Sequence, residues 1–228
     1  MLTRDQTAAN GYLCDQSLNS KVNLRRDHYG GSVDNRVRFV LELLEAVTAA
    51  IGPSKTAVRF SPFGTVMMPL DTDPLATFSY VLSEVEKLGI AYVCLTQPRT
   101  DLFLSEKTKW ENLHKASDTR AMKVSKEGIT LKPLFAILKN TPRFATGSYD
   151  DKNCFEEVES GELDAVTFAR WFISNPDLVE RIRRGVPLSP WKQETWYTSG
   201  RRGIRIILWL KCCKWRQLHS SNGSELHK

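Results

Sequence analysis

The sequence has 228 residues, of which 41% are hydrophobic and 25% are charged. This composition is typical of a soluble globular protein with one large domain or two small ones. No run of residues is long and apolar enough to cross a bilayer, and the first ten residues lack the apolar core of a signal peptide. These features exclude a membrane span and favour a cytoplasmic protein.

The net charge of +6 is concentrated at the end of the chain. Residues 201–228 contain seven of the 32 Lys and Arg residues and one of the 26 Asp and Glu residues, so the first 200 residues carry no net charge. A neutral main body gives no electrostatic reason to expect nucleic-acid binding. Two interpretations of the basic tail stay open: a carboxyl terminus altered by a frameshift, and an anchor for an anionic membrane surface.

The cysteines indicate neither disulfides nor a metal site. There are five of them, an odd number, and their spacing matches no metal-binding pattern. We therefore expect reduced thiols, as in a cytoplasmic protein, and no bound metal.

Helical and strand patterns alternate along the chain. Apolar residues at three- and four-residue steps predict helices, and short continuous apolar runs predict buried strands. The predicted elements are a helix over 35–51, a strand over 56–61, a helix over 73–88, a strand over 90–95, a helix over 129–138, a strand over 143–147, a helix over 150–161, a strand over 163–168 and a helix over 178–184. No strand is predicted before residue 7, and a long charged loop is predicted over 97–128. Buried strands separated by helices predict a parallel sheet covered by helices.

Residues suited to ligand binding follow the four predicted strands. Arg59, Gln97, Gly147 and Arg170 stand at the carboxyl ends of these strands. Ligands of (β/α)8 barrels bind at this end, but a complete barrel needs eight strands. The predicted fold class is therefore α/β, an incomplete (β/α)8 TIM barrel with about four parallel strands and their helices.

The stretch from Asn10 to Arg36 is dense in polar residues that are not expected to pack a core, and Tyr12 within it is expected to be buried. It reads Asn10-Gly11-Tyr12-Leu13, followed at fixed spacing by Asn23, Arg25, Asp27, Tyr29-Gly30-Gly31-Ser32, Asn35 and Arg36. At these positions the sequence resembles the Old Yellow Enzyme family of FMN-dependent ene-reductases. Thr7 stands where the family has a histidine. The resemblance covers the carboxyl-terminal half of the family's barrel and divides the chain into an unmatched leader (1–9), a partial barrel (10–200) and a basic tail (201–228).

The resemblance implies a reaction. In this family FMN is reduced by NADPH, hydride passes to the β-carbon of an α,β-unsaturated aldehyde or ketone, and a tyrosine protonates the α-carbon. Tyr12 matches that tyrosine, and a phenol is a neutral proton donor at pH 7; the alternative is a tyrosine that only packs after a turn. Asn10 matches a residue that donates to the substrate carbonyl. Thr7 replaces its partner, and losing one such donor typically costs about 10²–10³ in rate.

The resemblance also implies cofactor and substrate contacts. Arg59 matches an arginine beside the flavin ring, where a fixed cation stabilises the reduced, anionic form; its alternative is a salt-bridged barrel arginine. Gly147-Ser148 and Ala169-Arg170 match two segments that cradle the FMN phosphate, although Ser148 and Ala169 depart from the family's usual residues. Phe103 and Tyr197 match residues of the substrate pocket, and core aromatics are the alternative for both.

Together these features predict a truncated, inactive homologue of an FMN- and NADPH-dependent ene-reductase. The sequence of residues 58–99 resembles members of this family from fungal secondary metabolism, including the branch that reduces chanoclavine-I aldehyde in ergot-alkaloid synthesis. Two alternatives stay open. One is an active ene-reductase whose barrel is completed by a homodimer. The other is a non-catalytic fragment that binds a partner through the basic tail.

Overall fold

The computed structural model describes residues 4–98 and 130–192. These residues belong to two compact units. Unit 1 takes the described residues up to Ser148 together with Glu156–Val166, and unit 2 takes Tyr149–Phe155 and the described residues from Thr167 onward.

A parallel sheet forms the centre of unit 1. Its strands lie in the order β1 (Arg4–Ala8), β2 (Thr56–Phe60), β3 (Tyr92–Thr96), β4 (Arg143–Thr146) and β5 (Ala165–Thr167). β1 to β4 pair in parallel with their neighbours, with Thr7 opposite Arg59 and Arg59 opposite Cys94. Strand order equal to chain order is the arrangement of consecutive (β/α) units, so the predicted α/β partial barrel is confirmed.

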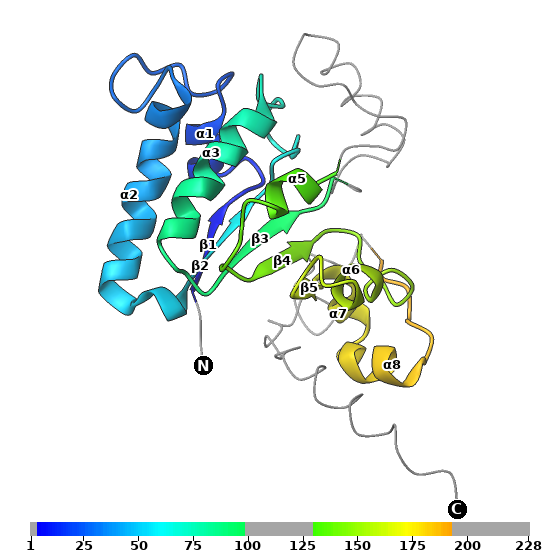
Figure 1. Cartoon of the computed structure of the whole chain (residues 1–228). Helices are drawn as coiled ribbons and strands as arrows, with labels where there is room; N and C mark the ends of the chain where they lie inside the picture. The colour runs from blue at the N-terminus through cyan, green and yellow to red at the C-terminus, as the bar shows by residue number, and fades with distance from the viewer. Residues whose placement is uncertain (1–3, 99–129, 193–228) are drawn as a thin grey trace, which may run out of the picture. The chain divides into compact units, whose positions relative to one another are not determined.

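Three helices, α1 (Leu13–Leu18), α2 (Val33–Ile51) and α3 (Pro74–Lys87), lie along one face of this sheet (Figure 1). Their apolar stripes are buried, as are the side chains of the facing strands, and Phe60 of β2 meets Phe78 of α3 edge-on at 5.8 Å between ring centroids. The Asp73 side chain accepts from the Ala76 amide and begins α3, which has proline at its first position. Unit 1 also holds a 3₁₀ turn (Pro53–Lys55), α5 (Lys132–Phe135) and α6 (Glu156–Glu159).

The opposite face of the sheet carries both apolar and charged side chains. Ala57, Tyr92 and Cys94 form a buried cluster, and the Tyr92 ring stacks on Phe144 with centroids 4.3 Å apart. Because residues two apart share a strand face, Arg59 lies on the same face as Ala57, and its partner Asp5 lies there too. In a closed barrel this face would be the interior.

Unit 2 contains α7 (Arg170–Ser174) and α8 (Leu178–Arg184). The fully buried Asn175 joins their connection to the residues after α8, since its side chain donates to the Ser189 carbonyl at 3.0 Å and accepts from the Ser189 amide at 2.8 Å. The Arg170 guanidinium lies over the Trp191 ring, 5.5 Å from its centroid. The predicted helix over 178–184 is confirmed.

Four sequence-based expectations about the elements were wrong. A strand, β1, precedes Thr7 although none was predicted, because its backbone pairs with β2 and Asp5 supplies the counter-charge of Arg59. Two predicted helices are much shorter than expected: the one over 129–138 is helical only at Lys132–Phe135, and the one over 150–161 only at Glu156–Glu159. The polar stretch predicted to stay out of the core forms α1 and contributes the buried Asp15, Asn19 and Arg36.

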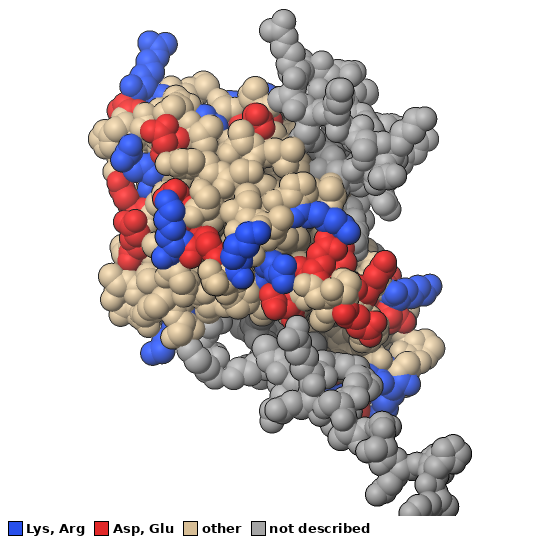
Figure 2. Space-filling model, in the orientation of Figure 1, with Lys and Arg blue, Asp and Glu red and all other residues tan. Residues whose placement is uncertain are grey.

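No helix within residues 4–98 and 130–192 is long and apolar enough to span a membrane. On the face drawn in Figure 2, basic and acidic side chains are interspersed over the described residues. Residues 99–128 of the loop predicted over 97–128, and the basic tail, lie outside the described residues.

Candidate functional site

A turn of unusual backbone conformation follows β1 and carries two of the predicted site residues. Asn10 has φ +58° and Gly11 has φ +78°, so both are left-handed, and Tyr12 then begins α1 with φ −80° and ψ 174°. Non-glycine residues with positive φ are uncommon and cluster at functional sites. Among the described residues only Asn10, Met67 and Ser148 have this conformation, and the family resemblance selected Asn10 and Ser148.

Hydrogen bonds from two other elements hold this turn. The Asn10 amide donates to Ser61 Oγ at 2.8 Å, just after β2 ends. The Gly11 amide donates to Asp15 Oδ2 on α1 at 2.9 Å, and Ser61 Oγ donates to the same oxygen at 3.0 Å. Asp15 and Ser61 are 1% and 2% exposed. Burial raises the Asp15 pKa to about 6, although the Gly11 and Ser61 hydrogen bonds oppose this shift and the Asp71 charge adds to it.

Gly11 has no room for a side chain. A Cβ built there would lie 2.5 Å from the Val66 carbonyl oxygen and 2.9 Å from the Met67 Cβ. We expect Gly11→Ala to destabilise the protein by about 1–2 kcal/mol from its positive φ and by about 1–3 kcal/mol more from this clash. Gly89→Ala is the matched control in urea unfolding, since Gly89 has φ +60° and open space around it. Equal losses in the two variants would contradict a tight site at Gly11.

Tyr12 is 57% exposed, so the expectation that it is buried was wrong. Tyr12 directly precedes α1, and its phenol is open to solvent rather than packed after the turn.

A small pocket behind the turn is lined by Asp15, Asn19, Ser61 and Asp71 among others, and its volume of about 10 Å³ leaves room for one water. Phe103 and Tyr197, the predicted pocket residues, lie outside the described residues.

Arg59 on β2 is tied to an acid on β1. Its Nη2 lies 2.7 Å from Asp5 Oδ2, and both side chains are largely buried. Burial alone would lower the Arg59 pKa, but Cys94 and Asp5 outweigh it and raise the pKa; burial raises the pKa of Asp5 against the opposing effect of Arg59. Thr7 lies opposite Arg59 in the pairing of β1 with β2, and its side chain is exposed.

The residues on this face are compatible with the ring of FMN. Three buried polar atoms there lack a hydrogen-bond partner within the described part of the chain: Arg59 Nε, Thr96 Oγ1 and Asp5 Oδ1. The first two can donate to ring carbonyl or nitrogen acceptors, which a flavin has along one edge. Asp5 partly neutralises the cation, so Arg59 would stabilise an anionic flavin less than an unpaired arginine.

The two predicted phosphate-binding segments lie in different units and are described separately. In unit 1, Gly147 has φ +99°, and a Cβ there would meet the Gln97 backbone at 3.2 Å, so the ends of β3 and β4 approach closely. In unit 2, Ala169 has φ −125° and precedes the short helix that begins at Arg170. The Cβ of Ala169 therefore causes no backbone strain.

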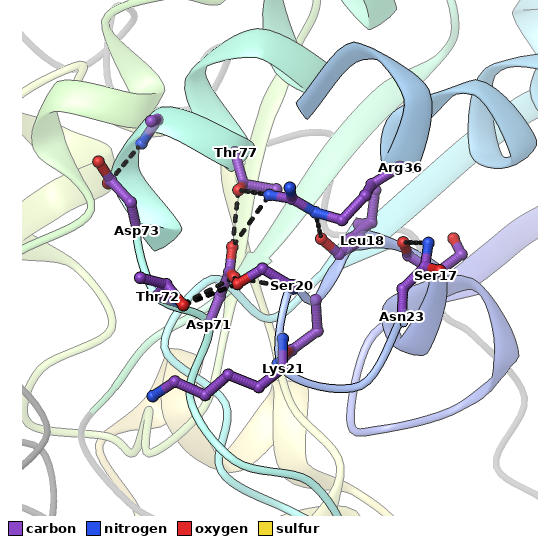
Figure 3. A network of polar contacts seen from close by, with 12 residues as sticks. Ser17, Leu18, Ser20, Lys21, Asn23, Arg36, Asp71, Thr72, Asp73 and Thr77 are labelled. Carbon is purple, nitrogen blue, oxygen red and sulfur yellow. Dashed lines mark hydrogen bonds and ion pairs between the residues drawn. The ribbon is translucent and has the colours of Figure 1, made fainter. Parts of the chain in front are cut away.

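Much of the polar stretch from Asn10 to Arg36 stabilises the fold, as Figure 3 shows. Arg36 of α2 donates to the Leu18 carbonyl at 2.8 Å, the Gly31 carbonyl at 2.6 Å and Thr77 Oγ1 at 3.0 Å. Asp71 accepts from the Ser20 amide, the Thr72 amide and Thr77 Oγ1. These bonds join the α1–α2 connection to the loop before α3.

Sequence reasoning missed four residues of the site: Asp5, Asp15, Ser61 and Asp71. Ser61 directly follows the Arg59 strand, and Asp15 stands five residues after Asn10, so position near the predicted site was the available signal. Nothing local indicated which distant residues they would bind.

The described residues form a parallel α/β sheet of the barrel type, with a donor-bearing turn after β1 and a buried cation on β2. Comparison with known proteins agrees: the model of the NADH:flavin oxidoreductase / NADH oxidase family matches residues 7–189. The chain therefore belongs to this family, and the predicted Old Yellow Enzyme relationship is confirmed.

Individual relatives match over a limited part of their length. The chain is 36% identical over 191 residues to 12-oxophytodienoate reductase 2 of Arabidopsis thaliana, covering 84% of this chain and 46% of that protein. Against enoate reductase 1 of Kluyveromyces lactis it is 35% identical over 206 residues, covering 86% and 48%. The structure of the old yellow enzyme homologue from Zymomonas mobilis superposes with a TM-score of 0.73 at 30% identity, covering 88% and 51%. The chain thus spans about half the length of the relatives it matches.

Proposed function

We propose that this chain carries the proton-donor and flavin-edge half of an FMN- and NADPH-dependent ene-reductase site, and that it does not turn over an enone by itself. The observation that carries the proposal is the left-handed Asn10–Tyr12 turn beside Arg59 on the next strand. The turn supplies a phenol and an amide, and the strand supplies a cation.

Each group has a distinct chemical task in this proposal. FMN, when bound, supplies the hydride that NADPH provides. The Tyr12 phenol gives its proton to the α-carbon, the Asn10 amide donates to the substrate carbonyl oxygen, and Arg59 offsets negative charge at the flavin edge. In unit 1, Gly147-Ser148 would offer backbone amides to the FMN phosphate. In unit 2, Ala169-Arg170 match the family's other phosphate-binding segment, where a guanidinium would supply a cation.

Two observations support the absence of turnover. Thr7 has one hydroxyl proton where the family has a histidine, and the Tyr12 phenol is open to water.

For the substrate class we propose α,β-unsaturated aldehydes or ketones. The resemblance of residues 58–99 to fungal secondary-metabolism members supports an alkaloid-pathway enal such as chanoclavine-I aldehyde as the ancestral substrate. A cytoplasmic location is part of the same proposal.

The test is a titration of the purified chain with FMN, followed by flavin fluorescence and absorbance, and then an assay of NADPH oxidation with an enal. We expect weak or no quenching and no enal-dependent oxidation. Stoichiometric flavin binding, with enal-dependent oxidation that Tyr12→Phe abolishes, would overturn the proposed inactivity. Light scattering on the same sample would then show whether a homodimer completes the site.

A partner-binding role for the basic tail is a separate outcome. Deletion of residues 201–228 that removed binding to a partner without changing flavin behaviour would favour that role over a catalytic ancestry alone.

A further inference from the structure

We propose that Ser61 and Asp15 are positioning residues that fix the Asn10–Tyr12 turn and thereby set the directions of its two donor side chains. The proposal rests on the proposed function of Asn10 and Tyr12. It assigns a task to the loop after β2 and to α1 that neither the family match nor the relatives' names describe.

Ser61 and Asp15 together form what we call the clamp. It joins the turn after β1, the loop after β2 and α1 through one hydroxyl and one carboxylate oxygen. Ser61 Oγ accepts from the Asn10 amide at 2.8 Å and donates to Asp15 Oδ2 at 3.0 Å. The same oxygen accepts from the Gly11 amide at 2.9 Å. Ser61 uses its single proton on Asp15, so its remaining lone pairs are free for the Asn10 amide. The direction of every bond in this chain is therefore determined.

The turn needs such a clamp because its backbone is held away from its preferred conformation. A left-handed non-glycine residue costs about 1–2 kcal/mol and persists when the surroundings impose it. Asn10 and Gly11 follow β1 and precede α1, so their amides have no place in either the strand or the helix ladder. Gln16 also stabilises the turn, since its side-chain nitrogen donates to the Gly11 carbonyl at 2.6 Å.

Fixing the backbone also fixes the donors, because the side-chain direction at a residue follows from its φ and ψ. A relaxation of Asn10 toward negative φ would swing both its amide group and the start of α1 at Tyr12. In a site where donors must meet a reacting atom closely, a displacement of about 1 Å can cost 10²-fold in rate. Ser61 and Asp15 act through the turn and need not touch substrate.

The charges around the clamp are few among the described residues. Asp71, from the loop before α3, borders the same small cavity and raises the Asp15 pKa, and Cys14 precedes Asp15 on α1. Asp71 is itself held by Ser20, Thr72 and Thr77, which contact neither Asn10 nor Gly11. Asp71 is therefore a matched control: it is a buried aspartate at the same cavity that does not bind the turn.

The experiment is amide NMR and hydrogen exchange on the full flavin-free chain. We expect Ser61→Ala to speed exchange of the Asn10 amide by about tenfold or more and Asp15→Ala to do so at Gly11. Asp15→Asn keeps an acceptor oxygen and should retain protection of Gly11 while abolishing the pH dependence of its chemical shift, whose midpoint in the parent should lie near pH 6. Asp71→Asn should leave both amides unchanged.

Unchanged exchange at Asn10 and Gly11 in Ser61→Ala and Asp15→Ala would overturn the clamp. Equal acceleration in Asp71→Asn would also overturn it, because the effect would then reflect general loosening of unit 1. Since no flavin is present, a failure of FMN binding leaves this test intact. A failed clamp would likewise leave the flavin titration informative.

Discussion

Replacing Arg36 with methionine is expected to destabilise unit 1 by about 3–5 kcal/mol, the largest effect of any single change considered for this chain. The Arg36 side chain is 8% exposed. Its guanidinium donates hydrogen bonds to the Leu18 and Gly31 carbonyls and to Thr77 Oγ1, and it forms an ion pair with Asp71 Oδ2 at 3.9 Å. Methionine fills similar volume but donates nothing, so two carbonyls lose their donor and a buried carboxylate loses its nearby cation. Urea unfolding followed by far-UV circular dichroism gives the midpoint and slope from which this loss is calculated.

The control for this prediction stands on the same helix. Arg38 is only half-buried and donates to the His28 carbonyl at 2.9 Å and to Asn35 Oδ1 at 3.1 Å, so Arg38→Met should cost about 1 kcal/mol, well below the loss at Arg36. A double variant of Arg36→Met with Asp71→Asn should be less destabilised than the sum of its singles, because the uncompensated charge is then removed. Additive losses would show that Arg36 acts through the two carbonyls and Thr77 rather than through Asp71.

The second large effect is a change in how stability depends on pH. Burial raises the Asp15 pKa from 3.8 to about 6, so between these values the folded chain binds more protons than the unfolded chain. Stability contributed at this site therefore falls as pH rises through that interval, by about 3 kcal/mol in total. Asp15→Asn cannot ionise and avoids this loss. Relative to the parent, it should gain about 2 kcal/mol of stability between pH 4 and pH 7, because part of the loss has already occurred at pH 4.

The measurement is urea unfolding of parent and variant at several pH values across that range. Asp71→Asn is the comparison: burial would raise the Asp71 pKa, but the hydrogen bonds from Ser20, Thr77 and Thr72 lower it below 3.8. Stability due to the titration of Asp71 itself is therefore present above its ordinary pKa and lost only as pH falls below it. Between pH 5 and pH 7 the difference from the parent should change much less than for Asp15→Asn, because only the contribution of the Asp71 charge to the Asp15 pKa is removed. Parallel curves for the parent and Asp15→Asn would contradict proton linkage at Asp15.

The polar stretch from Asn10 to Arg36 identified the family correctly, but the expectation that its residues stay out of the core was wrong. Instead Asn23 donates to the Ser17 and Tyr29 carbonyls at 2.7 Å, and Arg36 is buried beneath the connection. Fixed polar residues in this stretch hold an irregular connection together because its carbonyls have no helix or strand partners.

β1 shows the opposite error. Its sequence, Arg-Asp-Gln-Thr-Ala, has no apolar run or clear alternation, so pattern reasoning predicted no strand. The strand forms because β2 offers backbone partners from Thr56 to Phe60 and because Arg59 requires a counter-charge, which Asp5 provides. Both partners lie more than fifty residues away along the chain.

The sequence by itself determined the alternation of strands and helices, the parallel sheet, the incomplete barrel and the family. These follow from local periodicity and from motif spacing, which the covalent chain carries directly. Only the tertiary structure decided that Asp5 neutralises Arg59 and that Ser61 and Asp15 hold the Asn10–Tyr12 turn. The partners in these contacts are 54, 51 and 46 residues apart for Asp5–Arg59, Asn10–Ser61 and Asp15–Ser61. A polar residue's own neighbours say nothing about which distant group it will meet, because that choice is made when the strands pair and burial forces each polar group to find a partner.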